Sequence, residues 1–143
     1  MSQARKMARQ AVIQALYQWQ IAEQDLQSIE TQFREEKAQS KMDMDYFVEL
    51  LHAIPKEKSA LDDLIEPCVD RTLQEVNPVE LSILRMAVYE LKQRLDIPYR
   101  VVINEAVDLT KKYGADQGHK FVNSILDKLA KTLRSAEVSA KKS

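Results

Sequence analysis

One stretch, residues 77–95 (NPVELSILRMAVYELKQRL), constrains the fold more than any other part of the chain. Asn77 is a preferred N-cap residue, and Pro78 suits the first helical position, where its missing N–H costs no hydrogen bond. Glu80 is placed to reach back to the Asn77 N–H and so complete a capping box. Apolar residues then cover most of the helix circumference until Pro98 ends the pattern, because proline disfavours helical geometry at the residue before it. The stretch predicts the buried central helix of an all-helical domain.

Helical spacing of apolar residues recurs along the rest of the chain, and no segment shows sustained two-residue alternation. Only 2 glycines and 4 prolines are present, which leaves little material for the turns of a β-protein. A chain of 143 residues fits one domain. We therefore expect one all-α domain over residues 1–134, followed by a small, polar and basic tail over residues 135–143 that is disordered.

Capping and breaking residues indicate where the other helices begin and end. A first helix is expected over about residues 3–22, and a later one over residues 99–113 with Gly114 as its stop. Pro55 is expected to kink or break the third helix. The expected N-caps of the remaining helices are Asp25 or Ser28, Asp43 and Asp116.

Charge is distributed unevenly along the chain, although the formal net charge is only -1. Residues 1–22 carry 3 basic residues and no acid, residues 23–98 hold 9 Lys/Arg against 17 Asp/Glu, and residues 99–143 hold 9 against 5. Two basic ends around an acidic middle would create one basic face if the ends meet in the fold. This pattern favours a polyanionic partner only modestly, because many helical proteins are uneven in charge by chance.

A basic cluster on the first helix is the strongest local signal for nucleic acid. Arg5, Lys6 and Arg9 lie within one turn, and Tyr17 returns to within about 20° of the line of Lys6. Basic side chains with an aromatic ring on the same flank are suited to holding phosphates and stacking a base. From spacing alone, a solvated charged helix end with a partly buried tyrosine is the simpler interpretation.

Signals of enzyme chemistry are absent from the sequence. There is no Gly-rich phosphate loop, HExxH, CxxC or GxSxG motif. His52 has no partner at metal-ligand spacing, and His119 is more typical of a polar helix start than of a catalyst. Cys68, the only cysteine, fits a packed thiol in a reducing compartment. We expect a cytoplasmic binding protein with no catalytic residues, no metal and no cofactor, since neither a signal peptide nor a membrane-spanning run is evident.

Four stretches together resemble the NusB family of bacterial transcription antitermination factors, most closely its proteobacterial members. They are ARQAVIQALYQWQ (8–20), NPVELSILRMAVYEL (77–91), IPYRVVINEAVDLTKKYG (97–114) and HKFVNSILDKL (119–129). The resemblance implies about seven helices in two three-helix bundles packed around the central helix. It also implies a non-enzymatic adaptor that binds the single-stranded boxA element of nascent ribosomal RNA together with the ribosomal protein NusE. Such an adaptor helps other Nus factors to assemble on RNA polymerase.

The resemblance further implies which residues form the site. The RNA-binding residues would be Arg5, Lys6, Arg9, Tyr17, Arg85, Tyr113, Lys120 and Phe121. Glu80 and Arg85 would lie at the partner surface. The alternative role for Glu80 is capping of the helix, and the alternative role for Phe121 is packing in the core. Three positions depart from the pattern of relatives: Met7 replaces a frequent basic residue, Gln117 replaces an acid, and Cys68 replaces a tyrosine.

Two other interpretations stay open at the level of sequence. The departures at Met7 and Cys68 would suit a helical scaffold that binds only proteins and has lost RNA affinity. The same helical unit also occurs as the RNA-binding domain of ribosomal RNA cytosine methyltransferases, whose catalytic domain has no counterpart here. The acidic middle, residues 23–98, is a plausible docking face for a basic ribosomal protein.

Overall fold

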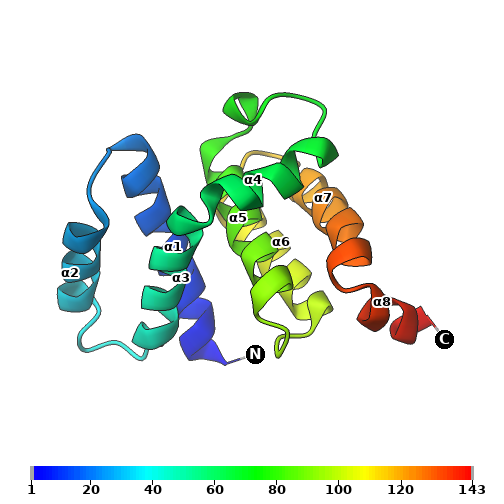
Figure 1. Ribbon diagram of the computed structural model, residues 1–143. Helices are drawn as coiled ribbons and strands as arrows, with labels where there is room; N and C mark the ends of the chain where they lie inside the picture. The colour runs from blue at the N-terminus through cyan, green and yellow to red at the C-terminus, as the bar shows by residue number, and fades with distance from the viewer. Residues whose placement is uncertain (1, 143) are drawn as a thin grey trace. The chain divides into compact units, whose positions relative to one another are not determined.

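The computed structural model describes residues 2–142, and the side chains of residues 2–140. Within these residues the chain forms eight α-helices and two short 3-10 helices and no strand, which confirms the all-α prediction (Figure 1). The α-helices are α1 (Gln3–Ile21), α2 (Leu26–Glu36), α3 (Met44–Lys56), α4 (Lys58–Ile65), α5 (Pro78–Gln93), α6 (Tyr99–Tyr113), α7 (Gly118–Leu133) and α8 (Ser135–Lys142). The 3-10 helices are η1 (Glu66–Cys68) and η2 (Leu73–Glu75).

The chain divides into two compact units, Met1–Glu57 and Lys58–Ser143, where the sequence suggested one domain over residues 1–134. Three helices, α1, α2 and α3, pack against one another in the first unit. In the second unit, α5, α6 and α7 pack against one another, with α4 on α5 and α8 on α7. The expected two three-helix bundles are therefore present, one in each unit.

The first unit is built from helices whose caps the sequence predicted. Asp25 accepts a hydrogen bond from the Ser28 N–H at 3.0 Å and begins α2, and Asp43 caps α3 in the same way. The rings of Phe33 and Phe47 stack in the core with centroids 5.1 Å apart. Pro55 lies in the last turn of α3, so the helix ends one residue beyond it.

Helix α5 forms the core of the second unit, as its apolar circumference predicted. All residues from Glu80 to Leu91 are buried, so the helix has no solvated face over this length. Asn77 caps it by accepting hydrogen bonds from the N–H groups of Val79 (2.9 Å) and Glu80 (3.2 Å). The predicted reach of the Glu80 side chain back to Asn77 does not occur, because that carboxylate is engaged at the connection between α6 and α7.

The connection between α6 and α7 is four residues long, 114–117. Helix α6 ends at Gly114 as predicted, and its bounds match the predicted helix. Helix α7 begins one residue later than an Asp116 cap would allow. Gln117 stands before it in the left-handed region, with φ 66°, and this conformation turns the chain into the new helix.

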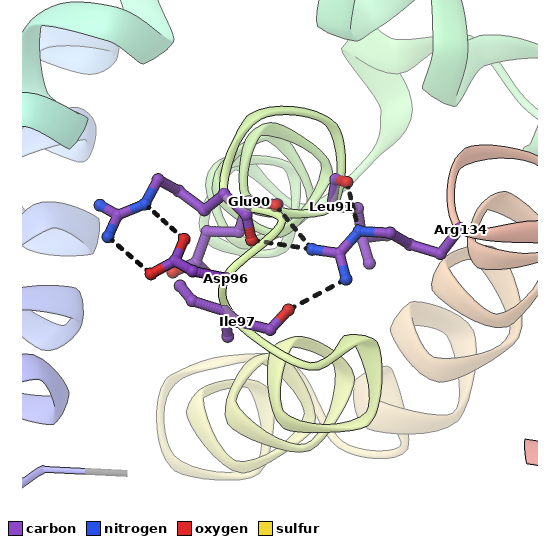
Figure 2. A network of polar contacts seen from close by, with 6 residues as sticks. Glu90, Leu91, Asp96, Ile97 and Arg134 are labelled. Atoms are coloured by element: carbon purple, nitrogen blue, oxygen red, sulfur yellow. Dashed lines mark hydrogen bonds and ion pairs between the residues drawn. The ribbon is translucent and has the colours of Figure 1, made fainter. Parts of the chain in front are cut away.

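Residues 135–142 form α8, whereas the sequence predicted a disordered tail beginning at residue 135. The cause is Arg134, a side chain only 4% exposed, whose guanidinium donates to the carbonyl oxygens at the end of α5 and beyond (Figure 2). The distances to its acceptors are 2.7 Å for Leu91, 2.9 Å for Ile97, 2.9 Å for Arg94 and 3.2 Å for Glu90. The Glu90 carbonyl also accepts from the Arg94 N–H, and the Arg94 carbonyl from the Ile97 N–H, each at 3.0 Å. Arg134 therefore adds donors, from far along the sequence, to carbonyls at and beyond the end of α5.

Glu137 completes this network from α8. Its carboxylate accepts from Arg134 Nη1 at 2.7 Å and from the N–H of Tyr99, the first residue of α6, at 2.9 Å. Val138 is buried beside it. Because one carboxylate joins Arg134, at the end of α7, to the start of α6, the segment that follows Arg134 is held in place. Residue 143, the last of the predicted tail, lies outside the described residues.

Candidate nucleic-acid interface

In the unit Met1–Glu57, the basic cluster of α1 gathers around Tyr46 of α3. The guanidinium carbon of Arg5 lies 4.6 Å from the centre of the Tyr46 ring, and that of Arg9 lies 5.4 Å from it. Tyr46 is 3% exposed, and a cation over an aromatic face is attracted by the ring quadrupole. The ring therefore fixes two of the three basic side chains of the predicted motif.

These side chains differ in access to solvent. Arg9 is 1% exposed, so in this conformation its guanidinium presents almost no surface to a phosphate. Arg5 and Lys6 are partly exposed, and Tyr17, further along α1, is 43% exposed. The solvent-accessible part of the predicted motif is Arg5, Lys6 and Tyr17.

In the unit Lys58–Ser143, the side chain of Glu80 binds the backbone of the α6–α7 connection. Its Oε2 accepts the N–H of Ala115 at 2.8 Å, and the side chain is 5% exposed. Gly114, in the connection, and Gly118, the first residue of α7, both lie against this side chain. A Cβ on Gly118 would be 2.7 Å from Glu80 Cδ and closer still to Oε2, and one on Gly114 would be 3.1 Å from Oε2. A carboxylate at the N-terminus of α7 also meets the positive end of that helix.

Arg85 is buried as well and is committed to an ion pair. Its guanidinium binds the Asp62 carboxylate of α4 through two parallel bonds, Nε to Oδ1 at 2.8 Å and Nη2 to Oδ2 at 3.0 Å. The Arg85 side chain is 5% exposed and that of Asp62 is 17% exposed. This fork geometry ties α4 to α5, which accounts for a charged residue on an otherwise apolar helix.

The exposed predicted residues of this unit flank the α6–α7 connection. Tyr113, the last residue of α6, is 45% exposed, and Lys112 Nζ lies 5.3 Å from the centre of its ring. Lys120 is exposed in the first turn of α7, and Phe121 beside it is partly exposed. The guanidinium carbon of Arg71 lies 4.6 Å from the centre of the Phe121 ring. Two cation–aromatic pairs thus border one turn.

Two functional candidates, Tyr46 and Arg71, were not predicted from the sequence. Tyr46 comes three residues after the N-cap Asp43 and directly before a buried phenylalanine, which is a weak signal that its ring points inward. Arg71 lies in a polar connecting segment without periodicity, and nothing local relates it to Phe121, 50 residues later in the chain. Of the two histidines, His52 has the predicted structural role, since its Nε2 lies 2.6 Å from Glu30 Oε1 and joins α3 to α2.

The fold and these surfaces define a class of protein: all-helical over the described residues, with basic and aromatic side chains exposed or partly exposed in each of its two units. The family model for the NusB family matches residues 6–131, and the chain belongs to this family. Transcription antitermination protein NusB of Pseudomonas entomophila is 51% identical over 141 residues, which cover 99% of this chain and 85% of the relative. The protein of the same name from Hahella chejuensis is 51% identical over 139 residues, covering 97% and 93%.

Solved structures agree with this assignment. T. maritima NusB superimposes with a TM-score of 0.78 at 34% identity, covering 92% of this chain and 93% of that one. A chain from the crystal structure of antitermination factors NusB and NusE in complex with dsRNA gives a TM-score of 0.80 at 28% identity, covering 92% and 99%. None of the helices in the described part of the chain combines the length and the hydropathy that a membrane-spanning segment requires.

Proposed function

We propose that this protein is a non-enzymatic transcription antitermination factor of the cytoplasm. It binds the single-stranded boxA element of nascent ribosomal RNA together with the ribosomal protein NusE, and so helps to assemble the antitermination complex on RNA polymerase. The observation that carries the proposal is the likeness, at 51% identity over nearly the whole chain, to transcription antitermination proteins. The solved complex of NusB and NusE with RNA supports the choice of both partners.

The exposed candidates supply the contacts in this proposal. Arg5 and Lys6 hold phosphates and Tyr17 stacks a base in one unit, while Tyr113, Lys120 and Phe121 do the same at the α6–α7 connection in the other. The three buried candidates act through other residues. Arg9 supports the Tyr46 ring, Glu80 positions the α6–α7 connection, and Arg85 joins α4 to α5.

The partner surface follows from charge. Residues 23–98 carry 17 acidic against 9 basic residues, and exposed acids such as Glu35 and Glu36 attract a basic ribosomal protein. Reversing the charge of both acids should weaken NusE binding and lessen its dependence on salt. Unchanged affinity and salt dependence would show that this acidic pair is not the docking surface.

The RNA contacts are tested by salt dependence. Binding of single-stranded RNA releases counterions, so log K falls with log salt by about 0.7 per phosphate engaged. The double variant Arg5→Gln, Lys6→Gln should therefore bind more weakly and show a slope smaller by about 1.4. Lys37→Gln, Lys41→Gln is the matched control, because it removes the same charge from the α2–α3 connection of the same unit.

A fluorescence-anisotropy titration at several salt concentrations measures both quantities. The proposal expects the control to keep the slope of the wild type. Equal losses of affinity and slope in both double variants would show that only net charge matters and that α1 carries no defined RNA site.

A further inference from the structure

Arg71, in the Lys58–Ser143 unit, is an exposed cation that lies against Phe121. It lies between η1 and η2, its side chain is 41% exposed, and its guanidinium covers the Phe121 ring at 4.6 Å. Since Phe121 is itself a proposed stacking residue, a base that approaches this face meets the guanidinium first. The Arg71 guanidinium and the Phe121 ring therefore form one surface of two stacked layers, with the guanidinium outermost.

The segment that carries Arg71 is held in place on both sides. Asp70 Oδ1 lies 3.1 Å from Arg71 Nε, and this hydrogen bond keeps the pKa of the Asp70 carboxyl below its usual value. On the other side, Thr72 and Glu75 form a capping box in which Glu75 Oε1 accepts from the Thr72 N–H at 3.2 Å and the hydroxyl at 2.9 Å. Leu73 is buried directly after the box begins. These contacts hold the backbone around Arg71 in place, so its guanidinium has a defined position over Phe121.

The chemistry of this surface suits a nucleotide. A guanidinium is planar, stacks on aromatic rings and also donates hydrogen bonds at its edge, so its outer plane can take a nucleobase. Asp70 engages the Nε edge, which leaves the two Nη groups as donors for a phosphate oxygen. An ammonium group would supply the same charge without a plane. The site therefore requires arginine specifically if a base stacks there.

We propose that Arg71 is a further RNA-contact residue, whose guanidinium is layered between Phe121 and one unpaired nucleobase and donates to the adjacent phosphate. The inference rests on the proposed function, because the ligand is the same single-stranded RNA. It adds a contact from the segment between η1 and η2, which the basic motif of α1 does not include.

The test separates stacking from charge. Arg71→Lys keeps the charge and loses the plane, and Arg71→Ala loses both. Arg34 provides the matched control, since it is 52% exposed and is paired with Glu30 at 2.8 Å on α2. We expect both Arg71 variants to weaken binding of boxA-like RNA by roughly 5–10-fold, the low end for loss of one stacked base. Arg34→Lys and Arg34→Ala should bind as the wild type does.

A second readout reports stacking directly. When 2-aminopurine is placed at one RNA position at a time, wild-type protein should quench its fluorescence at the stacked position, and Arg71→Lys should reduce that quenching. Wild-type affinity and quenching in Arg71→Lys would overturn the inference while the proposed function stands. If wild-type protein fails to bind the RNA, both fall. Far-UV circular dichroism of each variant establishes that the fold is intact.

Discussion

Gly118→Ala is the sharpest probe of how the α6–α7 connection is held. Gly118 is the first residue of α7 and is buried, and its φ is not positive, so alanine meets no backbone penalty there. By helix propensity alone the change would stabilise the protein by about 0.5–1 kcal/mol. The obstacle is a single side chain, because the new Cβ would lie 2.7 Å from Glu80 Cδ.

The cost follows from what Glu80 must give up. Moving its carboxylate breaks the 2.8 Å hydrogen bond from the Ala115 N–H, and a bond to a charged group contributes about 1.5–3 kcal/mol. Overpacking a tight site costs about 1–3 kcal/mol more. After the gain in propensity, we expect Gly118→Ala to lower the free energy of unfolding by about 1.5–5.5 kcal/mol.

A double-mutant cycle identifies Glu80 as the cause. Glu80→Ala removes the obstacle, so Gly118→Ala should cost far less in that background, with a coupling energy of about 2–3 kcal/mol. Urea unfolding followed by circular dichroism at 222 nm measures all four proteins. Wild-type or higher stability of the single Gly118→Ala variant, or strict additivity in the double variant, would refute the account of how Glu80 holds this turn.

Two further predictions concern side chains remote from the RNA surface. Arg134→Met should destabilise the protein by about 3–5 kcal/mol in urea unfolding, because the Leu91 and Ile97 carbonyls lose the guanidinium as their donor in a buried site. A loss below about 1 kcal/mol would mean that water replaces the guanidinium there. Hydrogen bonds from Arg34 and then His52 lower the pKa of Glu30 from its usual 4.5. The stability that this lowered pKa provides is therefore fully present above pH 4.5 and is lost as pH falls through the lower pKa of the folded state. Wild type and Glu30→Gln should thus differ in free energy of unfolding at neutral pH and converge in acid. A difference that stays constant down to strongly acidic pH would contradict this prediction.

Local signals predicted the helices well where the cause of the structure is itself local. Asn77, Asp25 and Asp43 cap the helices they were expected to cap, and the bounds of α6 were predicted from an apolar face with a glycine at its end. Each of these features depends on residues within one or two helical turns. The sequence pattern contains that information directly.

Two of the failed predictions share one physical cause, which is a partner far away in the sequence. Glu80 was expected to complete a box with Asn77 but instead binds Ala115, 35 residues later, where two glycines leave room for it. The residues after Arg134 looked disordered because nothing nearby reveals that this side chain caps a helix some 40 residues earlier. No periodicity records either pairing.

The candidate site shows the same division. Lys6, Tyr17 and Tyr113 were identified from a pattern and a resemblance; in the structure Lys6 is partly exposed and both tyrosines are exposed. The same reasoning could not distinguish them from Arg9 and Arg85, whose burial follows from tertiary packing. The sequence pattern around a basic helical residue is the same whether its side chain is exposed to solvent or buried in an ion pair.

The most direct test of the central claim is a fluorescence-anisotropy titration of a boxA-like RNA and a scrambled RNA of the same composition, with and without NusE, at two salt concentrations. A site with about three to five phosphate contacts binds modestly and is sensitive to salt when the protein acts alone. We predict that NusE sharply tightens binding of the boxA-like RNA and leaves the scrambled RNA unaffected. Equal, weak binding of both RNAs that NusE does not change would contradict the account, and the chain would then be a protein scaffold of the same fold.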